Sequence, residues 1–420
     1  MDNSDDPDRQ IVIATEHLRL VLGELGDQAD VLKDDARLGL TLIQLPDLRA
    51  AADRLEAERC KAFESASVPE TSTDLDRVLA NLRVLIEQRY NGWTPPMGKN
   101  RTMTGLQFKP YASAGGFAEP TPAKPLAEFE ALPRAHRRVR VGLLDTRLDQ
   151  HSWLSGRYLA DPDALVKSSP DEDPAFGEGR LWWEGHATFI AGMVLAQAPA
   201  ADLDVRTALR RERGTASGHS WTMPVWEFAG RLADYRDSGV SVLNLSLGCS
   251  TNDGKPPMVL ERAIAQLTPN IAVIAAAGNH GTATLDPQTR TRHGMPEPTA
   301  ALFPAALDGV LAVGALDADV PAEFNPRNGA NESEPAPWID VFAQGVNVTS
   351  TYLGESGGEQ VRIPAEDGGQ DKVVWFDGWA AWTGTSFAAG EITGAVAAEI
   401  ATGKTPQEAV ETVRNAYRRR

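Results

Sequence analysis

Apolar positions follow two different patterns along the chain. Between residues 10 and 90, short apolar runs alternate with segments of helical spacing. The apolar runs are Gln10–Ile13 and Leu38–Leu45, and both are short enough to be strands. Apolar residues recur at helical spacing over 18–25, 47–61 and 74–90. This order predicts a small α+β domain whose apolar helix faces form its core, with a partner-binding surface as the less favoured alternative.

From residue 138 onward, runs that are apolar throughout alternate with helical segments. The strand-like runs are Arg140–Leu144, Leu203–Arg206, Ser241–Leu245, Ile271–Ala275, Val310–Val313 and Ile339–Phe342. Strands without polar alternation, separated by helices, are typical of a parallel sheet that is covered on both faces. We therefore expect an α/β fold here, which closes with a helix that starts at the capping box Thr405–Glu408.

Between these two regions the composition changes to Gly, Pro, Ser and Thr, with little periodicity. Such a composition favours a linker over a packed element. The sequence therefore predicts an N-terminal α+β domain over 1–92, a Pro/Gly-rich linker over 93–137 and an α/β domain over 138–420.

Charge and cysteine content narrow the class of protein. The 420 residues include 41 basic and 58 acidic side chains, which gives a formal net charge of −17. This balance argues against a nucleic-acid-binding protein, which needs clustered Lys and Arg. Cys60 and Cys249 lie far apart in the sequence and form no metal-binding or disulfide pattern. No apolar run reaches the roughly 18 residues needed to span a membrane, and the acidic start of the chain is unlike a secretory signal. We therefore expect a cytoplasmic protein, with neither a membrane nor a nucleic acid as partner.

Four segments of the α/β region each present one reactive side chain. These residues are Asp145 at the end of an apolar strand, His186 at the start of a helix of small residues, Asn279 after a buried strand and Ser386 at the start of an Ala-rich helix. Each alone has a plain structural explanation, as a turn residue or a helix cap. Together they supply a carboxylate, an imidazole, an amide and a hydroxyl, which is the set that acyl transfer through a nucleophilic serine requires.

The order of these residues differs from that of two other groups of serine hydrolases. Asp precedes His and His precedes Ser, unlike the order in chymotrypsin or in the α/β-hydrolases. The segments Gly142–Thr146, Gly185–Gly192 and Gly384–Ala389 resemble the Asp, His and Ser motifs of the subtilases, the subtilisin-like serine peptidases of family S8. Val242–Gly248 resembles their substrate edge strand, and Ala276–Asn279 their oxyanion segment. The resemblance covers about two thirds of the chain.

This resemblance implies a subtilisin-like three-layer fold and the hydrolysis of peptide bonds. Ser386 would be the nucleophile, His186 its general base and Asp145 the carboxylate that orients the imidazole. The side chain of Asn279 would help to bind the oxyanion. A peptide substrate would add as a strand, on a site formed by Leu245, Ser246, Leu247, Gly248, Ala276, Ala277 and Gly278. We expect no cofactor, and the sequence contains no metal-binding motif. The resemblance makes bound calcium possible, but it assigns no residue of this chain as a calcium ligand.

The chain also departs from the family pattern. Ala187 and Phe189 stand where the family commonly has Gly and His, and Gly390 stands where it has Pro, which predicts a less rigidly placed Ser386. The tryptophans that precede the His and Ser motifs either line the substrate cleft or anchor the core; they are Trp182, Trp183, Trp375, Trp379 and Trp382. The polar, Gly-rich stretch Gly354–Gly378 is predicted to be a surface loop.

The role of residues 1–92 has two interpretations. By resemblance they form a prodomain that inhibits the peptidase until the linker is cut. Alternatively they stay attached as a regulatory module that responds to a protein partner. Two rival functions remain for the whole chain: a pseudopeptidase that acts as a binding scaffold, which the presence of all four residues argues against, and a peptide ligase or cyclase that uses the same acyl-enzyme.

Overall fold

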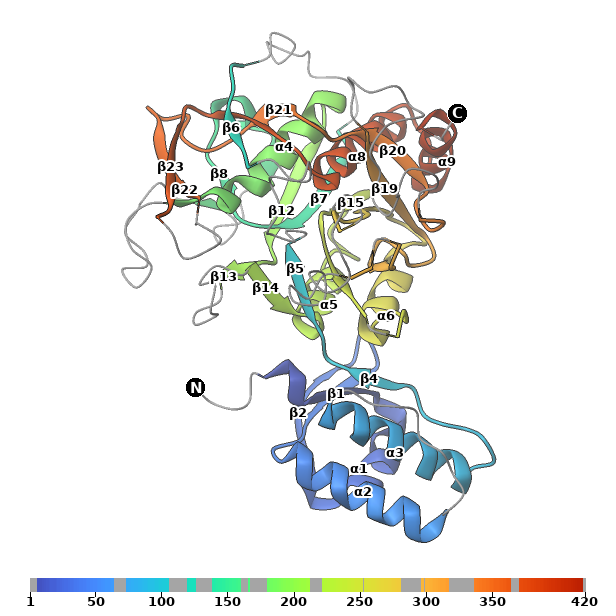
Figure 1. Ribbon diagram of the computed structural model, residues 1–420. Coiled ribbons are helices and arrows are strands. Elements are labelled where there is room, and N and C mark those ends of the chain that lie inside the picture. The colour runs from blue at the N-terminus through green and yellow to red at the C-terminus, as the bar shows by residue number, and fades with distance from the viewer. Residues whose placement is uncertain are drawn as a thin grey trace. The chain divides into compact units, whose positions relative to one another are not determined.

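The computed structural model describes most of the chain, and it divides into two compact units (Figure 1). The described residues are 6–63, 73–105, 119–125, 138–159, 165–166, 180–211, 221–251, 253–280, 296–297, 299–316, 336–363 and 370–417. We call Met1–Thr102, Pro224–Ala233 and Pro256–Ala263 together the N-terminal unit. We call Met103–Met223, Asp234–Lys255 and Ile264–Arg420 together the main unit. Parts of the predicted linker, residues 106–118 and 126–137, lie outside the described residues.

The N-terminal unit is built on a four-stranded antiparallel sheet with the order β2-β3-β1-β4. Its strands are β1 (Gln10–Ala14), β2 (Asp30–Asp35), β3 (Leu40–Gln44) and β4 (Met97–Lys99). The helices α1 (Leu18–Leu25), α2 (Leu48–Ala62) and α3 (Asp74–Arg89) bury their apolar faces against Ile11 and Ile13. The expected α+β order is present, and the apolar helix faces form the core of this unit.

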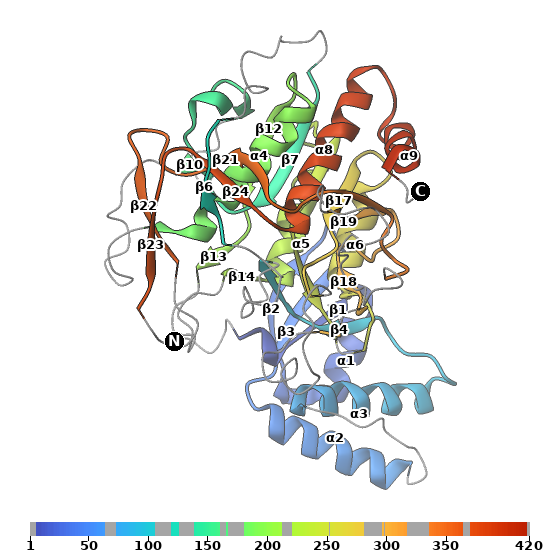
Figure 2. The ribbon, with the colours of Figure 1, turned by 45° about the horizontal axis from the view of Figure 1, so that its top comes forward.

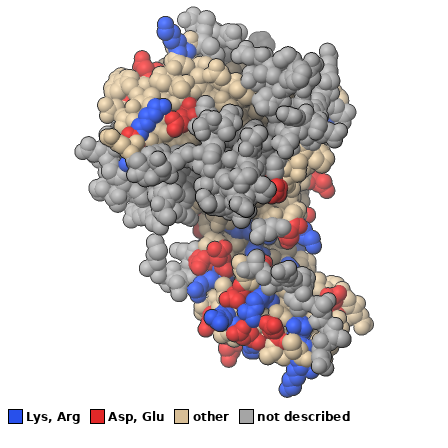
Figure 3. All heavy atoms as spheres, in the orientation of Figure 1, with Lys and Arg blue, Asp and Glu red and all other residues tan. Residues whose placement is uncertain are grey.

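Charged side chains of both signs lie interspersed on the surface of the N-terminal unit (Figure 3). Arg77 of α3 contacts Asp53 and Glu56 of α2 at 2.8 and 2.7 Å, so ion pairs join the two helices across their exposed sides. Each such exposed pair contributes less than about 1 kcal/mol, and the buried helix faces therefore contribute most of the stability.

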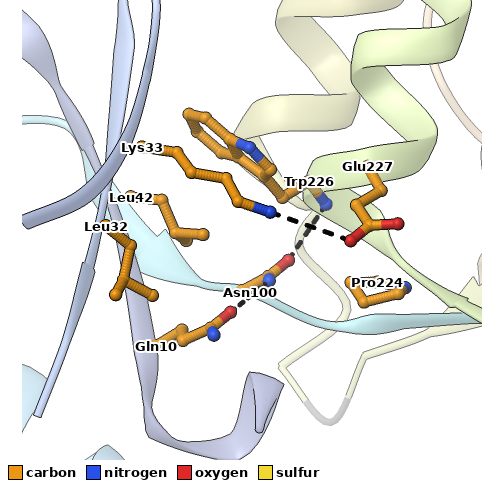
Figure 4. A pocket seen from close by; sticks show the side chains of 8 residues that line it. All are labelled: Gln10, Leu32, Lys33, Leu42, Asn100, Pro224, Trp226 and Glu227. Carbon is orange, nitrogen blue, oxygen red and sulfur yellow. Dashed lines mark hydrogen bonds and ion pairs between the residues drawn. The ribbon is translucent and has the colours of Figure 1, made fainter. Parts of the chain in front are cut away.

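The N-terminal unit also contains two segments from far along the chain, in α5 (Val225–Ala233) and α6 (Met258–Leu267). The side chain of Asn100 donates to Gln10 at 2.7 Å and accepts the backbone N–H of Trp226 at 3.0 Å (Figure 4). Arg262 donates to the carbonyl oxygens of Leu38 and Gly39, both at 3.1 Å. The pocket shown in Figure 4 has a volume of about 100 Å³, well below the roughly 300 Å³ of a typical small-molecule site. This region is therefore a packing contact within the unit.

A seven-stranded parallel sheet with the order β20-β19-β17-β15-β7-β12-β9 forms the centre of the main unit. Its strands are β7 (Arg140–Asp145), β9 (Tyr158–Leu159), β12 (Asp202–Thr207), β15 (Val242–Leu245), β17 (Ala272–Ala276), β19 (Val310–Leu316) and β20 (Val341–Gln344). Helices flank this sheet, so the α/β fold expected from the unbroken apolar runs is confirmed. None of the described helices is long and apolar enough to cross a membrane.

Two helices of the main unit, α4 (His186–Gln197) and α8 (Thr385–Ala401), lie side by side (Figures 1 and 2). Their approach is close, because a Cβ atom at Gly394 would lie 2.5 Å from the carbonyl oxygen of Val194. The capped C-terminal helix α9 (Pro406–Tyr417) packs on α8 and extends the same apolar core.

Several short strands occur where the sequence shows no clear pattern. The remaining strands are β5 (Thr102–Gly105), β6 (Thr121–Pro122), β8 (Leu148–Asp149), β10 (Leu165–Val166), β11 (Arg180–Leu181), β13 (Arg210–Arg211), β14 (Trp221–Pro224), β16 (Leu247–Ser250), β18 (Leu302–Phe303), β21 (Val348–Thr351), β22 (Glu359–Ile363), β23 (Lys372–Phe376) and β24 (Trp379–Trp382). The loop predicted over Gly354–Gly378 is wrong in part, because β22 and β23 pair there. Val373 and Trp375 face outward from β23, so this hairpin lacks the polar outer face that would identify a strand.

Candidate active site

Asp145 and His186 are brought together where β7 ends and α4 begins. Nδ1 of His186 lies 2.7 Å from Oδ1 of Asp145, and both side chains are buried. The same carboxylate oxygen accepts the backbone N–H of Thr146 at 2.7 Å. The hydroxyl of Thr146 accepts the N–H of Ala187 at 3.0 Å, which ties the strand end to the first turn of the helix. The carboxylate is therefore fixed on the imidazole by two adjacent contacts.

This contact determines which nitrogen of His186 is free to accept a proton. A carboxylate can only accept, so Nδ1 of the neutral ring carries the hydrogen and Nε2 has an available lone pair. Nε2 is buried and has no hydrogen-bond partner among the described residues. The imidazole therefore presents an unprotonated nitrogen, as a general base must.

Ser386 is the second residue of α8, and its backbone is anchored from the central sheet. The hydroxyl oxygen of Ser246 lies 3.3 Å from the carbonyl oxygen of Ser386 and 2.9 Å from Oδ1 of Asn244. Nδ2 of Asn244 donates to the hydroxyl of Thr393 on α8 at 2.9 Å. The N–H of Ser386 lies in the first helical turn, where no helix carbonyl is available to it. The helix continues through Gly390, the position where the family commonly has Pro.

Asn279 lies next to Ser386 through contacts with Thr385. Oδ1 of Asn279 accepts the backbone N–H of Thr385 at 3.0 Å and its hydroxyl at 2.9 Å. Because both contacts go to the carbonyl oxygen, they define which end of the amide is the nitrogen. Gly278 before it has a φ of +90°, a conformation that residues with a side chain rarely adopt. The turn after β17 thus brings the amide of Asn279 to the start of α8, with its oxygen bound to Thr385.

Aromatic rings surround the imidazole of His186. Trp183 stacks on it with ring centroids 3.9 Å apart and an interplanar angle of 22°. Trp382 meets it edge-on at 5.7 Å, and Phe387 lies 5.8 Å away. Phe189, at the position where the family commonly has His, packs on Phe387 at 4.3 Å. Trp183 and Trp382 are buried beside the imidazole, as expected of residues that anchor the core.

The other tryptophans of the cluster differ in exposure. Trp182 and Trp379 are buried, as expected of core anchors. Trp375 is 55% exposed on β23. The five tryptophans that precede the His and Ser motifs therefore do not share one role.

The residues predicted to bind substrate fall into two sets. Leu247 and Gly248 lie on β16, which pairs with β5 through Leu247↔Gly105 and Gly248↔Thr104. Leu245 is the last residue of β15 inside the central sheet, and Ser246 connects the two strands. The structure therefore places only the second half of the Leu245–Gly248 segment on β16, where it pairs with β5.

The predicted segment Ala276–Gly278 lies at the end of β17. Ala276 pairs with Val313 in the sheet, and Ala277 donates its N–H to the carbonyl oxygen of Val313 at 2.9 Å. Gly278 then turns the chain toward Asn279. A Cβ atom on Gly278 would lie 2.6 Å from the end of the Leu302 side chain, which would have to shift, whereas the φ of +90° itself favours glycine.

An ion cluster lies near the start of α4. Arg180 contacts Asp149 and Glu184 at 2.9 Å and Glu359 at 3.5 Å. Burial raises the pKa of Glu359, and the charge of Arg180 opposes that shift. The guanidinium group lies where these three carboxylates converge.

The described residues hold no cluster of three or more His, Cys, Asp or Glu side chains suited to a metal ion. Subtilases commonly bind calcium, which also takes backbone and amide carbonyl oxygens as ligands, and that set does not include those atoms. No step below uses a metal.

The sequence analysis assigned no role to two residues of the site, Thr146 and Thr385. Thr146 directly follows Asp145 in the Asp motif, and Thr385 directly precedes Ser386 in the Ser motif. Their hydroxyl contacts position neighbouring residues. A short polar residue beside each expected catalytic residue is the signal that could have identified them.

Comparisons with known proteins show the family of the chain. An α/β fold with this order of Asp, His, Asn and Ser defines the subtilisin-like class of serine peptidases. The chain matches the subtilase family over residues 136–419 and belongs to that family. Subtilisin BL and subtilisin Savinase from Lederbergia lenta are each 30% identical, over 53% of this chain and 72% of the relative. The structure of fervidolysin from Fervidobacterium pennivorans, a keratinolytic enzyme related to subtilisin, has a TM-score of 0.51 at 15% identity, covering 95% of this chain and 55% of that chain.

Proposed function

We propose that this subtilase is a serine endopeptidase that uses Asp145, His186 and Ser386 and that its own N-terminal region keeps it inactive. The observation that supports the first part is the 2.7 Å contact between two buried side chains, Asp145 and His186. That contact leaves Nε2 as the basic nitrogen, and the neighbouring helix α8 carries the serine.

The chemistry follows from these roles. Oγ of Ser386 attacks the scissile carbonyl carbon while its proton passes to Nε2 of His186. Asp145 stabilises the imidazolium that forms. The oxyanion is bound by the side-chain N–H₂ of Asn279 and the backbone N–H of Ser386. His186 then returns the proton to the leaving amine, and water hydrolyses the acyl-enzyme by the same proton path.

Substrate binding is proposed for the edge of β16. An extended peptide would form main-chain hydrogen bonds with Leu247 and Gly248, so recognition would depend only partly on the side chains of the substrate. The natural substrate is therefore a protein or peptide segment that can be extended. Hydrolysis is favoured over ligation only by family membership, and the mass of the product distinguishes the two.

Support for self-inhibition comes from β5. This strand follows the N-terminal unit directly and lies between β14 and β16 in a five-stranded sheet. Its Met103 is fully buried, and the hydroxyl of Thr104 donates to the carbonyl oxygen of Gly248 at 3.3 Å. The chain's own backbone thus occupies the strand edge that a substrate would need.

The register of β5 indicates where a cut would fall. Thr104 lies opposite Gly248 and Gly105 lies opposite Leu247. Ser246 directly precedes β16, and its hydroxyl contacts the backbone of Ser386. From Thr104 to Gly105 the strand advances along β16 toward Ser246. We therefore expect cleavage within the first few peptide bonds after Gly105.

The test is to incubate the purified full-length protein and to determine its N-terminus by mass spectrometry, alongside Ser386→Ala. We expect a new N-terminus shortly after Gly105 in the wild type and an intact chain in the variant. Activity on an added peptide should rise as that terminus appears. Cleavage of an added peptide by an intact chain would overturn self-inhibition and favour the retained module, whereas undiminished turnover by Ser386→Ala would overturn the assignment of the nucleophile.

A further inference from the structure

The stacked contact between Trp183 and His186 has no part in the proton path described above. Trp183 belongs to the short 3₁₀ helix η9 (Trp182–Gly185), which leads directly into α4 at His186. The two rings are three residues apart, and their 3.9 Å separation and 22° angle describe a face-to-face arrangement. The imidazole is fully buried and Trp183 is 5% exposed, so little water reaches this interface.

The indole of Trp183 is itself fixed in place. Trp182 and Trp382 each meet it edge-on, with centroids 5.7 Å away. The turn is anchored by Tyr352, whose hydroxyl donates to the carbonyl oxygen of Trp182. The ring of Tyr352 also lies so close to Gly185 that a Cβ atom there would be 2.2 Å from it. Trp183 therefore cannot move away from the imidazole without rearranging its surroundings.

We propose that Trp183 is a positioning residue that stabilises the imidazolium form of His186 through the face of its indole ring. The proposal rests on the proposed function. The face of an aromatic ring carries negative charge density, and tryptophan attracts a cation more strongly than phenylalanine or tyrosine does. In the proposed reaction, His186 becomes cationic when it accepts the proton of Ser386. The stacking is therefore stronger in the transition state than in the resting enzyme, which is the condition for accelerating the reaction.

Few charged groups lie near the imidazole of His186. Asp145 on β7 is the carboxylate that contacts the ring directly. Glu184 on η9 instead accepts from Arg180 at 2.9 Å and from the N–H of Leu181 at 3.1 Å. The ring neighbours on β24 and α8, Trp382 and Phe387, are uncharged. Among the described residues, the indole face therefore adds to Asp145 without competition from another charge.

The decisive measurement is an NMR titration of the His186 ring in the Ser386→Ala background, which needs no activity. Trp183→Leu keeps an apolar cover but removes the aromatic face, so the pH midpoint of the ring should fall by roughly half to one unit. Trp183→Phe should give a smaller fall in the same direction. The comparison variant is Trp182→Leu, which loses the same side chain from the same turn. Trp182 meets the indole of Trp183 edge-on, whereas Trp183 stacks on the imidazole, so the midpoint should fall by less than it does in Trp183→Leu.

Kinetics of the variants with Ser386 intact give a second readout. Trp183→Leu should lower kcat about three- to tenfold with little change in KM, whereas Trp182→Leu should retain most of kcat. An unchanged midpoint in Trp183→Leu, or the same fall in Trp182→Leu, would overturn the proposal and leave Trp183 a packing residue. If the wild type cleaves no peptide, the proposed function fails, and the titration still decides whether the indole stabilises the imidazolium.

Discussion

Thr385 orients the amide of Asn279 through two hydrogen bonds to a single oxygen. Its backbone N–H and its hydroxyl both donate to Oδ1, at 3.0 and 2.9 Å. The residue that precedes Ser386 therefore fixes the amide that we propose as the oxyanion donor. The position of the serine and the direction of the Asn279 N–H₂ group are set by one turn of α8.

We predict that Thr385→Val lowers kcat roughly three- to tenfold, because one of the two bonds that orient the amide is lost. Thr385→Ser retains the hydroxyl and should keep most of kcat. For comparison, Asn279→Ala should lower kcat by roughly 10²–10³, the range known for losing such a donor in subtilisin. Steady-state kinetics on one peptide measures all three, and a Thr385→Val enzyme with wild-type kcat would contradict the orienting role.

Removal of Arg180 should destabilise the folded main unit. Arg180→Met leaves Asp149, Glu184 and Glu359 close together without their shared cation. Breaking a fully buried pair costs about 3–5 kcal/mol, and the partial exposure of two carboxylates reduces this to about 2 kcal/mol. We therefore expect Tm to fall by roughly 4–8 °C.

Two comparisons make this prediction specific. Arg138→Met removes an exposed cation that pairs with Asp202, and it should change Tm by less than about 3 °C. The loss caused by Arg180→Met should be smaller at pH 5 than at pH 8, because burial raises the pKa of Glu359 and its protonation relieves part of the repulsion in the cluster. If Tm falls equally in the two variants, or if the fall in Arg180→Met does not depend on pH, the ion cluster around Arg180 does not stabilise the main unit as predicted.

His151 should make stability depend on pH. Its Nε2 donates to the carbonyl oxygen of Gly378 at 3.0 Å and its Nδ1 accepts the N–H of Trp153 at 3.2 Å, so the neutral ring satisfies both contacts. Burial lowers the pKa of His151 below its usual value near 6.5, although the charges of Glu355 and Asp149 oppose this shift. In the unfolded chain the ring takes up a proton below about pH 6.5. Stability is therefore highest above that pH and falls as the pH is lowered toward the folded-state pKa.

Thermal unfolding between pH 5 and 8 tests this dependence. The wild type should lose more Tm between pH 7.5 and 5.5 than His151→Gln does. Parallel curves for the wild type and His151→Gln would show that another group is responsible.

Weakening β5 should relieve inhibition. Met103→Asp places a charge at a fully buried position, so the strand should leave the edge of β16 more often. We expect the full-length variant to cleave an added peptide at a higher initial rate, before any cut of its own chain. Thr121→Asp, at an exposed position of β6, is the matched control. An unchanged initial rate in Met103→Asp would mean that β5 does not limit access.

The sequence predicted the sheet of the main unit because its strands are apolar throughout. It also predicted where Asp145, His186, Asn279 and Ser386 lie, because each stands where an apolar strand ends or an apolar helix begins. The catalytic roles of these residues remain a proposal. It did not predict β2, whose residues are mostly exposed and mostly charged, so no apolar alternation marks it.

The missed features share a physical reason. β5 has four residues, and its partner β16 lies more than 140 positions along the chain, so no local pattern could reveal their pairing. The stacking of Trp183 on His186 depends on the exact turn of η9, which the spacing of two aromatic residues does not determine. Contacts between residues that are distant in the sequence, and contacts that depend on the geometry of one turn, can be identified only in the folded structure.

The N-terminal unit draws on both sides of the expected cut, because α5 and part of α6 belong to it together with residues before Thr102. Cutting the chain after Gly105 would therefore turn one polypeptide into a two-chain complex that is held by contacts such as those of Arg262 and Asn100. Inhibition would then obey mass action: the released fragment would rebind at high protein concentration and dissociate on dilution. A freshly cut enzyme would thus gain activity as it is diluted, and its apparent specific activity would measure concentration as much as catalysis.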